Sequence, residues 1–121
     1  MKVLVIEDDM SVRETVGMVL EASGHEVVLL ESGVEALRYL EKNWPDALLL
    51  DLTLPEMSGE EIYAAIVKKF KKIPPTVILS AAQRGEDRTL YMPGALFLAK
   101  PYTIEDLESV LNQVVKARGA A

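Results

Sequence analysis

The stretch that most constrains this chain is residues 47–51, in which four apolar residues lead directly into Asp51. An uninterrupted apolar run of this kind, followed by a turn signal at Pro55, is typical of a strand buried on both faces of a parallel sheet. Asp51 would then stand at the carboxyl end of that strand. Because ligands of open α/β sheets bind beyond the carboxyl ends of the strands, the sequence predicts a functional site at Asp51.

The rest of the chain alternates short apolar runs with segments of helical periodicity. Because each strand is followed by a connection of suitable length for a helix, the pattern predicts a (βα)₅ fold of the α/β class. Right-handed crossovers then give a doubly wound parallel sheet with helices on both faces, and the common order of five such strands is 2-1-3-4-5. One domain is predicted, over residues 1–121. Strands are predicted at residues 3–6, 26–30, 47–51, 76–80 and 95–99.

Four residues are predicted to cap helices. Ser11, Ser32 and Ser58 are each followed three residues later by glutamate, which is the capping-box pattern. Thr103 is predicted to cap the last helix. The apolar face of that helix is predicted to comprise Ile104, Leu107, Val110, Leu111 and Val114.

The segment between the fourth and fifth strands is the least regular part of the pattern. Its first half is polar and contains Gly85, and Pro93 falls late in the stretch where a fourth helix is expected. Proline inside a helix costs about 3 kcal/mol, and an isolated helix of one or two turns is marginal in water. A short or irregular fourth helix is therefore predicted over residues 88–92.

The composition limits the functional classes. The chain has a net charge of −6, which argues against a general nucleic-acid binder, and it has no cysteine, which excludes disulfides and thiolate chemistry. The segment 1–6 is too short to be a signal peptide, and no segment approaches membrane-spanning length. A cytoplasmic protein without membrane contact is expected.

Several chemically active residues are predicted to meet at the carboxyl edge of the sheet. In the predicted strand order Glu7, Asp8 and Asp9 lie beside Asp51, while Ser80 and Lys100 end the fourth and fifth strands. Two carboxylates about 4 Å apart repel by roughly 4 kcal/mol at an effective dielectric near 20, so a proton or a cation must enter such a site. With no histidine or cysteine nearby, Mg²⁺ fits this oxygen-rich set best.

Lys100 and Ser80 are suited to contact phosphate oxygens, and a carboxylate between a metal ion and a lysine can be the nucleophile that forms an aspartyl phosphate. Taken singly, each of these residues is usually only a solvated loop residue or a cap. Their arrival at one sheet edge favours a phosphoryl-transfer site.

These residues are similar to those of response regulator receiver domains, from the first strand to the last helix. The matching motifs are Val5-Ile6-Glu7-Asp8-Asp9, Leu50-Asp51-Leu52-Thr53-Leu54-Pro55 with Gly59, Ser80-Ala81, Gly94-Ala95 and Lys100-Pro101. The resemblance implies a flavodoxin-like fold and a phosphorylation-controlled switch in a two-component phosphorelay. Its partners would be a histidine kinase or histidine phosphotransfer protein and an unspecified downstream effector, without direct contact to nucleic acid.

The resemblance also implies roles for individual residues. Asp51 would accept the phosphoryl group, and Asp8, Asp51 and the backbone carbonyl of Thr53 would bind Mg²⁺, with Glu7 acting through a bound water. Lys100 would contact the phosphoryl group. Ser80 would move to bond it, and Phe97 would become buried as the switch aromatic. A cis peptide bond is expected before Pro101.

Three alternatives stay open. Asp9 could replace Asp8 as the metal ligand. An aspartyl-nucleophile phosphohydrolase would need a second aspartate two residues after Asp51, where this chain has Thr53. A receiver-like interaction module that works without phosphorylation usually lacks one of the acids or the lysine, and none is missing here.

Other residues are assigned simpler roles. His25 is expected to be a solvated loop residue and Trp44 to pack under a helix end. The cluster Lys68, Lys69, Lys71 and Lys72 is interpreted as a solvated cationic helix end. The exposed flank of the first helix, at Ser11, Glu14 and Met18, has two equally weighted interpretations, namely kinase docking and plain exposure.

Overall fold

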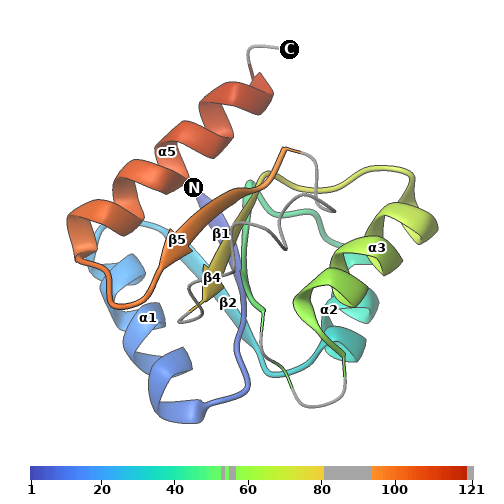
Figure 1. Cartoon of the computed structure of the whole chain (residues 1–121), viewed down its shortest axis with the longest axis horizontal. Coiled ribbons are helices and arrows are strands. Elements are labelled where there is room, and N and C mark those ends of the chain that lie inside the picture. The colour runs from blue at the N-terminus through green and yellow to red at the C-terminus, as the bar shows by residue number, and fades with distance from the viewer. Residues whose placement is uncertain (53, 55–56, 81–93, 120–121) are drawn as a thin grey trace.

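The computed structural model describes residues 1–52, 54, 57–80 and 94–119, with the backbone alone at residues 80 and 117–119, and shows a five-stranded parallel sheet between helices (Figure 1). The strands are hydrogen-bonded in the order β2-β1-β3-β4-β5, so the predicted fold class and strand order are confirmed. The strands are β1 (Lys2–Ile6), β2 (Glu26–Leu30), β3 (Ala47–Asp51), β4 (Thr76–Ser80) and β5 (Leu96–Ala99). The helices are α1 (Met10–Ala22), α2 (Gly33–Leu40), α3 (Gly59–Phe70) and α5 (Ile104–Gly119).

The central strand β3 is apolar throughout because both of its faces are covered. Leu48 and Leu50 pack against side chains of α2 and α3, whereas Ala47 and Leu49 pack against side chains of α1 and α5. All four side chains have 0% exposed surface. Successive side chains of a strand point to opposite faces, so a strand covered on both sides needs an unbroken apolar run.

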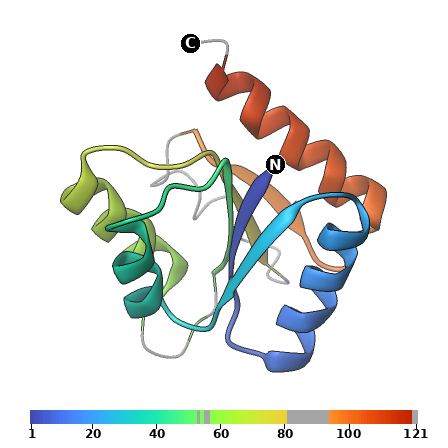
Figure 2. The same ribbon diagram turned by 180° about the vertical axis from the view of Figure 1, so that it is seen from behind.

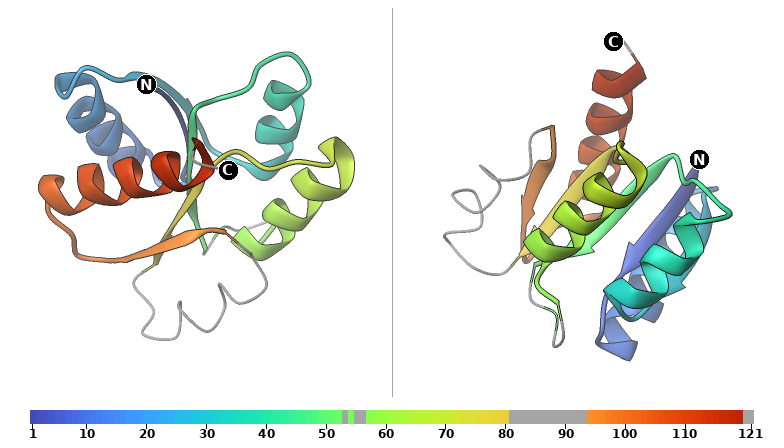
Figure 3. Two further views of the ribbon diagram at one scale, coloured as in Figure 1. Left: turned by 90° about the horizontal axis from the view of Figure 1, so that it is seen from above. Right: turned by 90° about the vertical axis from the view of Figure 1, so that its right-hand side faces the viewer.

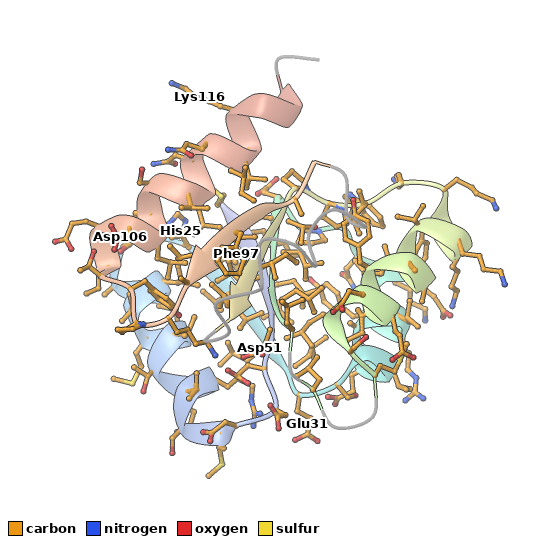
Figure 4. The ribbon with its side chains drawn as sticks, in the orientation of Figure 1. His25, Glu31, Asp51, Phe97, Asp106 and Lys116 are labelled. Carbon is orange, nitrogen blue, oxygen red and sulfur yellow. The ribbon has the colours of Figure 1, made fainter. Side chains whose placement is uncertain are left out.

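The helices form one layer on each side of the sheet. Viewed from above, α1 and α5 lie on one face and α2 and α3 on the other (Figure 3). Seen from behind, β2 runs between α1 and α2 at the sheet edge (Figure 2). Its residues are only partly buried, as expected for the predicted edge strand. The N-terminus and the last turn of α5 lie at the end of the molecule where the strands begin, away from Asp51 (Figures 1 and 4).

The cap predictions are confirmed for α3 and α5. The Ser58 hydroxyl accepts a bond from the Glu61 N–H at 3.2 Å, and the Glu61 carboxylate accepts one from the Ser58 N–H at 3.3 Å. Thr103 and Asp106 form the same reciprocal pair at the start of α5. Ser32 caps α2 as predicted.

The prediction that Ser11 caps the first helix is wrong. The N-cap is Asp9, whose side chain accepts a hydrogen bond from the Val12 N–H at 3.0 Å, and α1 therefore begins at Met10. Aspartate caps a helix about as well as serine, and its negative charge also favours the positive end of the helix dipole. Asp9 precedes Ser11 along the chain, so a helix that Asp9 caps already includes Ser11 in its first turn.

Two further predictions about exposure are wrong. Ile104 is 52% exposed, because it stands in the first turn of α5, before the fully covered Leu107. The His25 side chain is only 9% exposed, because its Nε2 atom lies 3.0 Å from both carboxylate oxygens of Glu108 on α5. Its Nδ1 atom lies 3.1 Å from the N-terminal amine. His25 is therefore a packed, hydrogen-bonded residue.

The predicted irregular helix over residues 88–92 lies outside the described residues. Within the ranges that the structure describes, no helix combines the length and the apolar character needed to cross a membrane.

Gly59 fixes the approach of α3 to the end of β3. Its N–H donates to the Leu52 carbonyl at 3.0 Å, and α3 begins directly at this residue. A Cβ atom at position 59 would lie 3.0 Å from the Leu52 Cα atom and 3.1 Å from the Asp51 carbonyl oxygen. Only glycine allows this spacing without a shift of the backbone next to Asp51.

We therefore expect Gly59→Ala to lower the free energy of unfolding by about 1–3 kcal/mol, the usual cost of overpacking, measured by urea denaturation. Gly17→Ala is the matched control on α1. Its added Cβ would come closest to a terminal methyl group of Leu29, at 2.9 Å, and that side chain can move, so we expect a smaller loss. Equal stability of Gly59→Ala and the unmodified protein would contradict the close-approach argument.

Candidate functional site

Three charged side chains meet at the carboxyl edge of the sheet, each delivered by a different strand. Asp51 is the last residue of β3, Glu7 directly follows β1, and Lys100 directly follows β5. Since β1 and β3 pair with Ile6 opposite Leu50, Glu7 and Asp51 leave the sheet side by side. Figure 4 shows Asp51 at this edge, on the side of the molecule away from Lys116 near the end of α5.

Lys100 joins the two acids. Its Nζ atom donates to Asp51 Oδ2 at 2.6 Å and lies 3.5 Å from Glu7 Oε1. The side chains of Asp51 and Glu7 are 8% and 6% exposed, and that of Lys100 is 27% exposed. Charges buried to this extent are costly unless they are paired, and here one ammonium group serves two carboxylates.

The crowding of negative charge changes the proton affinity of the site. Burial, together with the charge of Asp51, raises the pKa of Glu7 from 4.5 to about 7, and hydrogen bonds to Asp51 and Asp8 act in the same direction. Burial lowers the pKa of Lys100, but the hydrogen bond and charge of Asp51 outweigh it and hold that pKa above its ordinary value. Lys100 therefore stays positively charged beside an excess of carboxylate.

The acidic loop after β1 is held by α1. Asp8 is exposed, and Asp9 is engaged as the cap of α1 while its N–H donates to Glu7 Oε2 at 3.4 Å. The Arg13 guanidinium donates to the carbonyl oxygens of Glu7 and Asp8, at 2.8 and 3.2 Å. Glu7 is thus fixed through both its side chain and its backbone.

Sequence reasoning missed Arg13. A positive charge in the first turn of a helix opposes the helix dipole, so its presence there needs another explanation. That unfavourable position was the available signal, and the backbone carbonyls of the acidic loop provide the explanation.

The remaining predicted site residues are placed to different degrees. Ser80 ends β4 opposite Ala99, at the same edge as Asp51, but its side chain is not described. Thr53 lies outside the described residues. Phe97 lies on β5, where Figure 4 labels it, and it is partly buried against the core cluster that includes residues of α2 and α3. The predicted cis peptide bond between Lys100 and Pro101 is present.

The arrangement presents a fixed carboxylate with a cation in contact and two further acids beside it. Among the described residues, no three histidine, aspartate or glutamate side chains converge tightly enough to form a complete metal site by themselves. A metal ion bound here would have to complete its shell with main-chain carbonyl groups and water. Mg²⁺ commonly binds proteins in this way, through only one or two carboxylates.

Comparison of the sequence with known proteins identifies a family and several relatives. Residues 3–112 match the family described as the response regulator receiver domain. The transcriptional regulatory protein PrrA of Mycobacterium tuberculosis is 31% identical over 121 residues, which cover 98% of this chain and 52% of that protein. The response regulator MprA of Mycobacterium avium is 32% identical over 118 residues, covering 96% and 51%. The chain spans about half the length of the curated relatives it matches.

Solved structures of receiver domains and chemotaxis proteins have the same fold as this chain. The receiver domain of the sensor histidine kinase PA1611 from Pseudomonas aeruginosa, solved with a magnesium ion in its active-site cleft, superimposes with a TM-score of 0.84 at 26% identity. That match covers 95% of this chain and 97% of the other. The chemotaxis protein CheY4 of Vibrio cholerae gives a TM-score of 0.84 at 28% identity, covering 93% and 97%.

The family match spans most of the chain, the fold agrees, and the acids and the lysine stand at one sheet edge. This chain belongs to the family of response regulator receiver domains, the phosphoacceptor switches of two-component signalling.

Proposed function

We propose that this receiver domain accepts a phosphoryl group on Asp51 from the phosphohistidine of a histidine kinase or a histidine phosphotransfer protein. The observation that carries the proposal is the buried Asp51 carboxylate at the end of β3, held 2.6 Å from the Lys100 ammonium group. The domain acts on itself alone and returns to its resting state by hydrolysis of its own acyl phosphate. Its place of action is the cytoplasm, and its output passes to an effector.

The chemistry requires a nucleophile that is fixed and ionised. One carboxylate oxygen of Asp51 attacks the phosphorus atom, a P–O bond forms, and the P–N bond to the donor imidazole breaks. The imidazole leaves with the bonding electron pair and takes up a proton. Lys100 keeps Asp51 in place before transfer and then contacts the transferred group, whose oxygens carry the negative charge.

The residues present fit a magnesium ion. Glu7, Asp8 and Asp51 supply only oxygen ligands, and the buried carboxylates of Glu7 and Asp51 share the one ammonium group of Lys100. Asp8, Asp51 and the Thr53 carbonyl would hold the ion, with Glu7 acting through water. When bound, Mg²⁺ neutralises charge on the phosphoryl oxygens. Asp9 is already used as a helix cap, which favours Asp8 as the ligand.

Phosphorylation of Asp51 would change the positions of the Ser80 and Phe97 side chains. Ser80 ends β4, the neighbour of β3, and Phe97 lies on β5 opposite Ile78 of β4. The proposal assigns Ser80 a hydroxyl bond to the transferred group and Phe97 a more buried position once Ser80 has moved. The half-buried state of Phe97 leaves room for that change.

Incubation with acetyl phosphate and Mg²⁺ should add one phosphoryl group to the protein, detected by mass spectrometry and removed by hydroxylamine. We expect no labelling of Asp51→Asn, because an amide is not a nucleophile of this kind, and reduced labelling of Lys100→Met. Equal labelling of Asp51→Asn would overturn the assignment and leave a module that works without phosphorylation.

Mg²⁺ should raise the melting temperature, because a ligand that binds only the folded state stabilises it. We expect Asp8→Asn to gain less from Mg²⁺ than the unmodified protein. Asp9→Asn is the matched control, since asparagine caps helices as well as aspartate does, and it should keep the full gain. The reverse ranking would make Asp9 the ligand instead.

Without Mg²⁺, stability should depend on the pH through Glu7. Because its pKa is about 7 in the folded protein and has its ordinary value of 4.5 in the unfolded chain, its stabilising contribution is complete below 4.5 and is lost as the pH rises through about 7. The loss is on the order of 3 kcal/mol. Urea denaturation in EDTA at several pH values should show this loss in the unmodified protein and not in Glu7→Gln. Parallel curves for the two proteins would exclude Glu7 as the source.

A further inference from the structure

An open groove lies between the loop that follows α2 and the end of α3. Its volume is about 310 Å³. Leu40, Trp44 and Phe70 supply its apolar lining, and Glu41, Lys42, Asn43 and Lys72 supply the polar lining. The groove shares no residue with the site around Asp51.

The apolar lining is well ordered by aromatic packing. The rings of Trp44 and Phe70 meet edge to face, with centroids 5.7 Å apart and planes at 71°. Both side chains pack against the core cluster on the α2–α3 side, but neither is fully buried. The predicted packing of Trp44 under a helix end is confirmed, and its remaining exposed surface faces the groove.

The lining of the groove carries more positive than negative charge, with Lys42 and Lys72 beside the one acid Glu41, although the chain has a net charge of −6. The Lys72 ammonium group lies 4.3 Å from the centre of the Trp44 ring, and that of Lys69 lies 5.5 Å from the Phe70 ring. Lys69 also forms an ion pair with Glu41. Lys42 and Lys72 line the groove, and Lys68, Lys69 and Lys71 stand at the end of α3, close to Lys72 in the sequence.

The helix dipole accounts for only some of these lysines. Lys68 and Lys69 stand in the last turn of α3, where a positive charge is favourable. Lys42 and Lys72 stand beyond the ends of α2 and α3, and both contribute to the groove. Their positions fit a ligand that brings negative charge to the groove margin.

The groove is also separate from the phosphoryl chemistry. Trp44 precedes β3 and Lys72 precedes β4, so both lie at the amino ends of the strands, whereas Asp51 lies at a carboxyl end. At about 3.3 Å per residue, the five residues of β3 place the two ends roughly 13 Å apart, before the flanking loops are counted.

We propose that this groove binds an acidic peptide segment of a partner protein, which lays one apolar side chain against the exposed surfaces of Leu40, Trp44 and Phe70. Acidic residues on either side of that anchor would pair with Lys42 and Lys72. A peptide fits better than a nucleic acid, because Lys72 already covers a face of the indole ring on which a base would stack. The inference does not depend on phosphorylation of Asp51.

Trp44 is the only tryptophan of the chain, so its fluorescence reports directly on the groove. The probe is a short peptide with one leucine flanked on both sides by glutamates, titrated into the full chain at low and high salt. We expect a saturable change in Trp44 fluorescence that weakens as salt is added. A peptide with alanine in place of leucine should bind more weakly, because it lacks the apolar anchor.

Lys42→Glu should weaken binding of the peptide by roughly fivefold, since an attractive exposed pair becomes repulsive. Lys42 is exposed at the groove margin, so the fold should tolerate this change, and Lys72→Gln serves as a second variant. Lys116→Glu makes the same charge change at an exposed position of α5 and should leave the affinity unchanged (Figure 4).

Three results would overturn the proposal. One is the absence of any saturable fluorescence change, and a second is an equal loss of affinity in Lys42→Glu and Lys116→Glu. The third is tighter binding of a short single-stranded DNA oligomer than of the peptide, which would make the groove a nucleic-acid surface. Labelling of Asp51 by acetyl phosphate in Lys42→Glu should match the unmodified protein, so a failure here is distinguishable from a failure of the proposed function.

Discussion

The interaction between Lys100 and the two buried acids is the constraint on which the rest of the structure depends. Asp51 and Glu7 are almost removed from water, and removal of a single partner from such a group costs several kcal/mol. The fold meets this requirement because β1, β3 and β5 all end at one edge of the sheet. Asp51 is the last residue of β3, and Glu7 and Lys100 directly follow β1 and β5. The buried strands are therefore a means of placing charges, and the acids are tolerated because the lysine reaches them.

Much of this arrangement could be predicted from the sequence, for physical reasons. A parallel strand covered on both faces must be an unbroken apolar run, so residues 47–51 identify the centre of the sheet. Parallel strands end at the same edge, so polar residues that follow such runs are brought together whatever the loops do. The positions of Glu7, Asp51 and Lys100 follow from these two facts, because strand ends are local features of the sequence.

The errors arose where two local choices were similar in energy or where the partner was distant. Asp9 and Ser11 are both good helix caps, and the choice between them depends on where the chain leaves β1. His25 is buried by Glu108, which is 83 residues away and cannot be identified from a turn. Arg13 was overlooked because its partners are backbone carbonyl groups, which every sequence has. Spacing of apolar residues also gave no sign that Ile104 precedes the covered part of α5.

The contact between His25 and Glu108 has a mechanical consequence for the face that α1 and α5 share. His25 follows α1 and leads into the edge strand β2, while Glu108 lies on the last helix, near the opposite edge strand β5. A single side-chain bridge thus ties the two edges of the sheet across one face. Sliding of α5 over the sheet would first have to break this bridge. The bridge therefore restrains α5 relative to the turn between α1 and β2.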